Sequence, residues 1–108
     1  MNTNKESSDI GLRDQAVTTL KKVIDPELFV NIIDLGLVYA INFSSNLLEI
    51  KMTLSTPHCP LGEAITCRAQ HALSDAFPDR KIQVIIVWEP AWNPDMMTEE
   101  GRKELFSE

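Results

Sequence analysis

The sequence predicts an α/β protein of the α+β kind, a two-layer sandwich in which helices cover a small mixed sheet. The expected order of elements is α-β-β-α-β-α. Three observations predict it: two long segments carry apolar residues at helical spacing, two neighbouring segments alternate apolar and polar residues, and an apolar strand follows the second helix. The chain has 108 residues, a length at which one domain buries roughly 65% of its unfolded surface.

The first element is a helix that follows a polar N-terminal stretch. Residues 1–8 are expected to form a flexible tail, and residues 9–108 a single domain. Asp9 or the serine before it suits the N-cap position, and an apolar stripe interrupted by one arginine follows. The helix is predicted to end by Asp25, because Pro26 disfavours the α conformation in the residue before it.

A hairpin is predicted next, with strands over residues 37–43 and 48–55. The connector over residues 44–46 is short and ends in asparagine, which tolerates the left-handed conformation that tight hairpins need. Strict alternation gives the hairpin one buried face and one wetter face, and Thr53 belongs to the wetter set. The residues expected to share the other side of the first strand are Leu37, Tyr39, Ile41 and Phe43.

A second helix is predicted over residues 60–77, with proline at the first helical position, where its missing N–H is no loss. A third strand follows over residues 82–88. Its other face, Ile85 and Val87, is also apolar, and a strand buried on both faces is usually central. A last short helix is expected after Thr98, which suits its N-cap.

The charge balance argues against two classes of partner. Ten Lys and Arg residues stand against sixteen Asp and Glu, a net charge of −6, and no basic cluster occurs along the chain. We therefore expect no binding to nucleic acid or to anionic membranes. The N-terminus has no apolar leader, and no apolar run approaches the ~20 residues of a membrane span. These features predict a cytoplasmic protein.

The two cysteines, Cys59 and Cys67, are eight residues apart. On one helix that spacing separates them by roughly 12 Å along the axis. A disulfide needs Cα atoms within about 7 Å, so this spacing excludes one between the two cysteines. The spacing also prevents both sulfurs from binding one metal ion at about 2.3 Å unless the helix unwinds. The two cysteines are therefore considered separately. Cys67 is expected on the solvent-facing side of the helix, where it and His71 form an i, i+4 pair that could share a metal, although an ordinary helix surface is the more common reading.

Cys59 is expected at the start of the second helix, where unpaired N–H groups and the helix dipole favour an anion. This position lowers the pKa expected of the Cys59 thiol. Three interpretations remain open: a metal ligand, a nucleophile assisted by the neighbouring His58, or a small apolar filler in a proline-bracketed turn. Glu63 lies one turn further on, and its simplest role is to complement the first turn of the helix. The other acidic candidates near such a site are Asp25, Glu27 and Asp34.

The loop after the third strand is unusually apolar for an exposed segment. Packing within the domain would account for its aromatic residues, but the whole stretch suggests that it covers a site or docks a partner. The residues predicted to form this docking loop are Trp88, Trp92, Met96 and Met97.

Three sequence blocks together resemble the metal-sulfur cluster assembly factors of the SufT and PaaD type, a family once labelled a domain of unknown function. Matched in order and spacing, the blocks are more specific than any single motif in the chain. They are Asp25-Pro26-Glu27 with residues 30–39; Met52-Thr53-Leu54 through Pro57, Cys59 and Pro60; and Val87-Trp88-Glu89-Pro90 with Trp92 and residues 94–97.

This resemblance implies a fold similar to the C-terminal domains of NifU-type proteins and an accessory role in maturing iron-sulfur proteins. It also implies that Cys59 is the functional thiol, because Cys59 occupies the motif cysteine of the family. Glu27 and Asp34 fall on acidic positions of the family, with structural or site roles left open. No family position matches Cys67.

A cluster needs about four thiolate-like ligands, and this chain offers one well-placed cysteine. Any bound iron or iron-sulfur cluster should therefore be labile, with ligands completed by a second copy in a homodimer, by a small thiol or by a client apo-protein. The resemblance thus suggests a carrier or adaptor that works with the iron-sulfur assembly machinery. The rival interpretation is a small cysteine-dependent transferase that uses Cys59 with His58.

Overall fold

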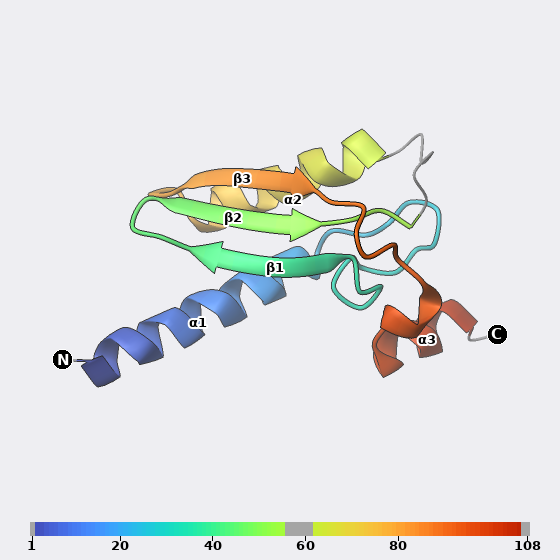
Figure 1. Ribbon diagram of the computed structural model, residues 1–108, viewed down its shortest axis with the longest axis horizontal. Helices are drawn as coiled ribbons and strands as arrows, with labels where there is room; N and C mark the ends of the chain where they lie inside the picture. The colour runs from blue at the N-terminus through green and yellow to red at the C-terminus, as the bar shows by residue number, and fades with distance from the viewer. Residues whose placement is uncertain (1, 56–61, 107–108) are drawn as a thin grey trace.

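The computed structural model describes residues 2–55 and 62–106, with side chains from residue 11 to 55 and from 63 to 106. Three strands form one layer, and the helices α1 and α2 pack behind it (Figure 1). The order of elements confirms the predicted α-β-β-α-β-α fold with a small mixed sheet. The elements are α1 (Asn2–Leu20), β1 (Val38–Phe43), β2 (Leu47–Met52), α2 (Gly62–Ala76), β3 (Lys81–Ile86), the 3-10 helix η1 (Pro94–Met96) and α3 (Glu99–Phe106).

The helix α1 begins at Asn2, so the predicted cap at residue 8 or 9 is wrong, whereas the flexibility predicted for residues 1–8 stays a prediction. No proline precedes the first turn, and the residues before Gly11 are compatible with helix, so nothing stops the helix from propagating to its start. The C-terminal end at Leu20 agrees with the prediction that the helix ends by Asp25. The predicted start of the second helix at Pro60 falls outside the described residues.

The sheet has the order β1-β2-β3, with β1 and β2 antiparallel and β2 and β3 parallel. The prediction that the third strand is central is wrong, because β2 occupies the centre. The hairpin pairs one edge of β2 with β1, and the α2 crossover brings β3 to the other edge. Ile85 in β3 and Val87 just after it, the second apolar face predicted for the third strand, are half-buried, and no other layer of described residues covers them.

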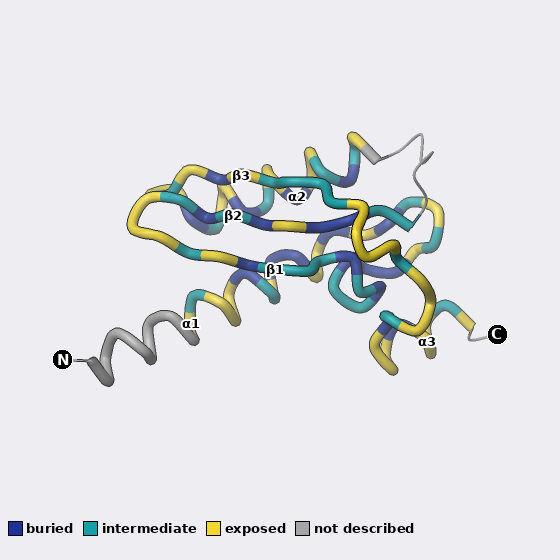
Figure 2. Tube along the Cα trace, in the orientation of Figure 1, coloured by how far each residue is buried: buried dark blue, intermediate teal, exposed yellow. Residues whose placement is uncertain are grey.

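The core lies between the sheet and the two long helices, where the buried segments of the chain face each other (Figure 2). Phe43 and Phe77 close one end of this core edge to face, with ring centroids 5.5 Å apart. The opposite face of the sheet carries exposed Asn42, Lys51 and Gln83. None of the helices over residues 2–55 and 62–106 has the length and apolar character to cross a bilayer. Residues buried in the core include Ala16, Leu20, Ile41, Leu48, Ile50, Met52, Ile65, Ala69 and Leu73.

Candidate functional site

Several chain segments meet beyond the end of β2. A ladder of backbone hydrogen bonds connects them: the N–H of Ile32 donates to Val23 (3.0 Å), that of Leu37 to Ile32 (3.0 Å), and that of Thr53 to Leu37 (2.8 Å). The loop between α1 and β1 therefore lies beside the chain that leaves β2. That chain continues into residues 56–61, which contain His58 and Cys59 and lie outside the described residues.

Asp25 organises the first turn of this loop. Its Oδ1 accepts hydrogen bonds from the backbone N–H groups of Glu27 (2.7 Å) and Leu28 (3.1 Å). Its carbonyl accepts from the N–H of Phe29 (2.8 Å), and its own N–H donates to Val30 (3.0 Å). The side chain is fully buried, yet Oδ2 has no hydrogen-bond partner within the described part of the chain. A buried, unpartnered carboxylate oxygen is costly and marks a candidate contact for a cation or a hydrogen-bond donor.

Thr53 supplies a second atom of this kind. The residue is fully buried, and its Oγ1 also lacks a hydrogen-bond partner among residues 2–55 and 62–106. Alternation predicts Thr53 on the wetter face of the hairpin, but the segment that ends at Leu37 lies against it and removes it from solvent. Asp25 was an acidic candidate from the sequence, whereas Thr53 was missed, because its burial comes from a contact with a segment outside the hairpin.

The other predicted acidic residues have different surroundings. Glu27 is exposed at the tip of the Asp25 turn, and Glu63 is exposed in the first turn of α2. Within residues 2–55 and 62–106, no three or more His, Cys, Asp or Glu residues come close enough to hold a metal ion. The described residues therefore supply fewer than three such ligands at any one place, and the predicted metal contact depends on Cys59.

Asp34 is engaged with the chain itself. Its Oδ2 accepts from Nδ2 of Asn31 (2.8 Å), and its Oδ1 accepts from the hydroxyl of Thr98 (2.9 Å). Its backbone carbonyl accepts from the N–H of Thr98 (2.9 Å), and its own N–H donates to Oδ1 of Asn31 (2.9 Å). Thr98 in turn accepts from the N–H of Gly101 (3.0 Å). Asp34 therefore attaches the start of α3 to the loop before β1.

The predicted docking loop is turned largely toward the domain. The indole N–H of Trp92 donates to the carbonyl of Leu35 (2.6 Å), and Met97 is buried in the core. Met96 is half-buried. Trp88 differs from these three residues, because 45% of it is exposed. Of the four residues predicted to dock a partner, Trp88 is the one that presents a large apolar surface.

Tyr39 joins this loop to the sheet and was not predicted as a site residue. The register of β1 against β2 shifts between Val38 and Ala40, so Tyr39 is an extra residue in a β-bulge that interrupts the predicted alternation. Its hydroxyl donates to the carbonyl of Pro90 (2.8 Å) and lies 3.4 Å from the sulfur of Met96. Desolvation by burial raises the pKa of Tyr39 above its usual 10.0.

Cys67 and His71 lie on the exposed side of α2, as the helical geometry predicted for the cysteine. Together with Gln70, Ser74 and Asp75 they line a shallow hollow of about 340 Å³. Cys67 is a free thiol. This surface faces solvent, and the pair supplies two side chains of the kind that bind metals, fewer than a stable site requires.

Comparison with known proteins places these features in context. The family model described as iron-sulfur cluster assembly protein matches residues 13–85. The Fe-S protein maturation auxiliary factor YitW of Bacillus subtilis is 39% identical over 81% of this chain and 86% of that protein. The Fe-S protein maturation auxiliary factor SufT of Staphylococcus aureus is 39% identical over 70% and 88%. The crystal structure of a domain of unknown function, DUF59, from Bacillus anthracis matches with a TM-score of 0.83 and 33% identity, over 88% of this chain and 92% of that one.

Proposed function

Since this chain belongs to the iron-sulfur cluster assembly protein family, we propose that it is an accessory factor in the maturation of iron-sulfur proteins. The observation that carries the proposal is the buried carboxylate oxygen of Asp25, which has no hydrogen-bond partner among the described residues. Asp25 belongs to the loop that is joined by a backbone hydrogen bond to the chain leaving β2, and Cys59 follows that chain in the sequence. A carboxylate and a thiolate are both ligands that bind iron. The two residues would form one half of a labile site for iron or an iron-sulfur cluster as cargo.

The chain acts as a carrier or adaptor in this proposal. Cys59 contacts the iron of the cargo or the thiolate of a client, meaning an apo-protein that receives the cluster. Because one cysteine leaves the remaining ligand positions open, a client cysteine, a small thiol or the Cys59 of a second copy fills them. Incomplete ligation suits a transfer protein, since the cargo has to leave.

The partners are the iron-sulfur assembly machinery and its clients in the cytoplasm. Trp88 is the residue of the predicted docking loop that offers an exposed apolar surface to them. Trp92, Met96 and Met97 support the loop from within, through the contacts that hold it against Leu35, Tyr39 and the core. Replacing Trp88 by alanine should then weaken maturation of a client while leaving the fold intact.

Anaerobic reconstitution with ferrous iron and sulfide tests the site. The wild-type protein should bind iron and gain visible absorbance, and Cys59→Ala should lose both. Cys67→Ala is the matched control, because it removes an exposed cysteine from α2 and should behave as wild type. Asp25→Asn keeps the oxygen that organises the turn and changes the unpartnered one, so it should fold normally and bind iron less well.

Two results would contradict the proposal. Equal iron binding by Cys59→Ala and wild type, together with normal activation of an iron-sulfur enzyme in cells that carry the mutant, would remove Cys59 from the function. Covalent labelling of Cys59 by a substrate, with a slower reaction in His58→Ala, would instead indicate a cysteine-dependent transferase.

A further inference from the structure

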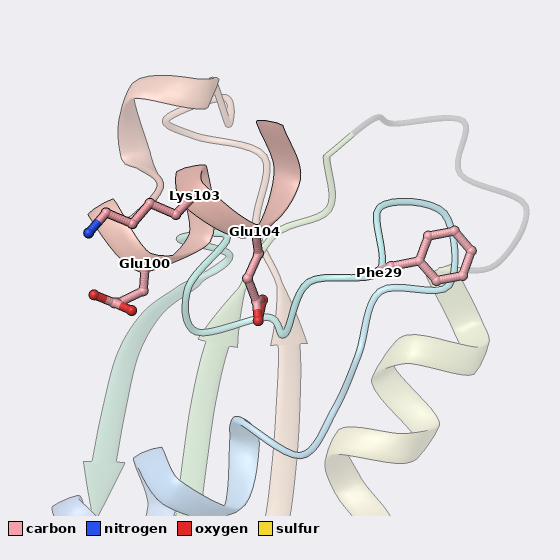
Figure 3. Close-up of a pocket in the computed structure, with 4 residues that line it drawn as sticks. All are labelled: Phe29, Glu100, Lys103 and Glu104. Atoms are coloured by element: carbon pink, nitrogen blue, oxygen red, sulfur yellow. The ribbon is translucent and has the colours of Figure 1, made fainter. Parts of the chain in front are cut away.

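A groove lies between the Asp25 turn and the C-terminal helix, outside the site described above. Phe29 from the turn and Glu100, Lys103 and Glu104 from α3 line this groove, whose volume is about 500 Å³. In Figure 3 the side chain of Glu104 extends from α3 toward the loop, and the ring of Phe29 projects from the tip of that loop. We refer to this feature as the Phe29 groove.

Phe29 is held in an unusual conformation. Its φ angle is 60°, in the left-handed region that bulky side chains avoid, and 78% of the residue is exposed. The hydrogen bonds that flank it, from Phe29 to Asp25 and from Asp25 to Val30, fix this geometry. Burial of the ring within the domain does not compensate for this strain, because the ring is exposed. A strained residue that presents an aromatic ring to solvent is typical of a binding surface.

The charges on α3 point to the chemistry of the ligand. Glu100 and Glu104 are an i, i+4 pair of like charge, which destabilises a helix, and Glu104 lies near the C-terminal end, where the helix dipole disfavours a carboxylate. No ion pair involves either residue in the part of the chain that the structure describes. Lys103 is paired with Glu99 at 3.6 Å. Figure 3 shows Glu104 directed toward the loop that carries Phe29, whereas Glu100 and Lys103 extend away from Phe29. The groove therefore offers the carboxylate of Glu104 on the side of the Phe29 loop, and Glu100 adds a second negative charge one turn earlier in α3.

We propose that the Phe29 groove binds a segment of a client protein in which Lys or Arg stands next to an apolar side chain. The basic group pairs with Glu104, Glu100 adds to the negative potential of this end of α3, and the apolar side chain packs against the ring of Phe29. The net charge of −6 favours the approach of such a segment. The inference rests on the proposed function for the identity of the client, since Phe29 belongs to the same turn as Asp25.

The test is an amide NMR titration of the full chain, labelled with ¹⁵N. The probes are a small panel of capped hexapeptides that place Lys or Arg next to Leu or Phe, and matched peptides with Glu in place of each basic residue. The basic peptides should shift the amide signals of Phe29, Glu100 and Glu104 more than the amide signals of the other residues. The acidic peptides should leave these signals unchanged.

Variants assign the interaction to the groove. Phe29→Ala, and separately Glu100→Gln combined with Glu104→Gln, should each weaken binding by about fivefold to tenfold, as expected from the loss of one aromatic contact or of the two exposed negative charges. The control combines Asp75→Asn with Asp79→Asn, which removes the same charge at the opposite end of the sheet and should change binding less than twofold.

Three results of the titration would overturn the inference: no binding by any basic peptide at millimolar concentration, equal binding by acidic and basic peptides, or equal weakening in the control variant. Signals of the groove that shift with protein concentration alone would assign it to a second copy of the chain, and would also overturn it. Iron binding by Phe29→Ala separates the two proposals, because it should remain normal. Loss of the groove interaction and loss of Cys59-dependent iron binding are therefore independent outcomes.

Discussion

Thr98 donates two hydrogen bonds to Asp34 across 64 positions of the sequence, one from its N–H to the backbone carbonyl and one from its hydroxyl to the carboxylate, both 2.9 Å long. This contact attaches α3 to the loop that precedes β1. Because that loop also carries the Asp25 turn, the contact sets the position of α3 relative to Phe29 and to the candidate site. The Phe29 groove thus depends on a pair of residues that do not line it.

Replacing Asp34 by alanine should lower the free energy of unfolding by about 1–3 kcal/mol, because Asn31 and Thr98 lose their acceptor. Urea denaturation, with an unchanged slope against denaturant, measures the loss. Asp95→Ala is the control, since the side chain of Asp95 is 95% exposed and its pair with Arg102 is a surface contact. The control should stay within about 0.5 kcal/mol of wild type. Equal losses in the two variants would show that the Asp34 contacts contribute nothing specific.

Gly101 allows α3 to approach the loop closely. A Cβ added at Gly101 would lie 2.4 Å from the carbonyl oxygen of Asp34, which is backbone and cannot move aside cheaply. Gly101→Ala should therefore displace α3 and lower the melting temperature, despite the better helix propensity of alanine. Gly11→Ala in α1 is the matched control, because no atom lies within 4 Å of the added Cβ. It should stabilise the protein by up to about 1 kcal/mol. A stabilised Gly101→Ala variant would contradict the close packing of α3.

Tyr39 should titrate at a higher pH in the folded protein than in the unfolded chain. Burial raises its pKa above 10.0, so the stability it contributes is present below that value and is lost as the pH rises through the folded pKa. Tyr39 is the single tyrosine, so tyrosinate absorbance reports on it alone. The pH at the midpoint of the tyrosinate absorbance change should fall toward 10.0 in concentrated urea. The absorbance change itself should be absent in Tyr39→Phe. Identical midpoints with and without urea would mean that the hydroxyl is solvated in the folded state.

Sequence patterns correctly predicted the helices and strands whose formation depends on residues close together in the chain. Alternation and a short connector were sufficient to identify the hairpin, and helical periodicity placed Cys67 on the exposed side of α2. The central position predicted for the third strand failed, because strand order depends on how α2 crosses the sheet. The bulge at Tyr39 and the burial of Thr53 likewise arise between segments far apart in the sequence, and no local pattern encodes them.

The same distinction applies to the candidate site. The sequence identified Asp34 as an acidic candidate, but its hydrogen bonds to Asn31 and Thr98 became visible only in three dimensions. Asp25 became the stronger candidate for the opposite reason, because one of its buried carboxylate oxygens has no hydrogen-bond partner among the residues that the structure describes. The roles predicted for His58 and Cys59 remain predictions, since both residues lie outside the described part of the chain.

Phe29→Gly should be more stable than Phe29→Ala by about 1 kcal/mol, because glycine adopts the left-handed conformation at this position without strain and alanine does not. Both variants lack the ring, so both should lose the same affinity for the basic peptides. Urea denaturation and the NMR titration, applied to the pair, therefore separate the cost of the conformation from the contribution of the ring. If the glycine variant were the less stable of the two, the turn would not be strained, and the argument that strain serves binding would fail.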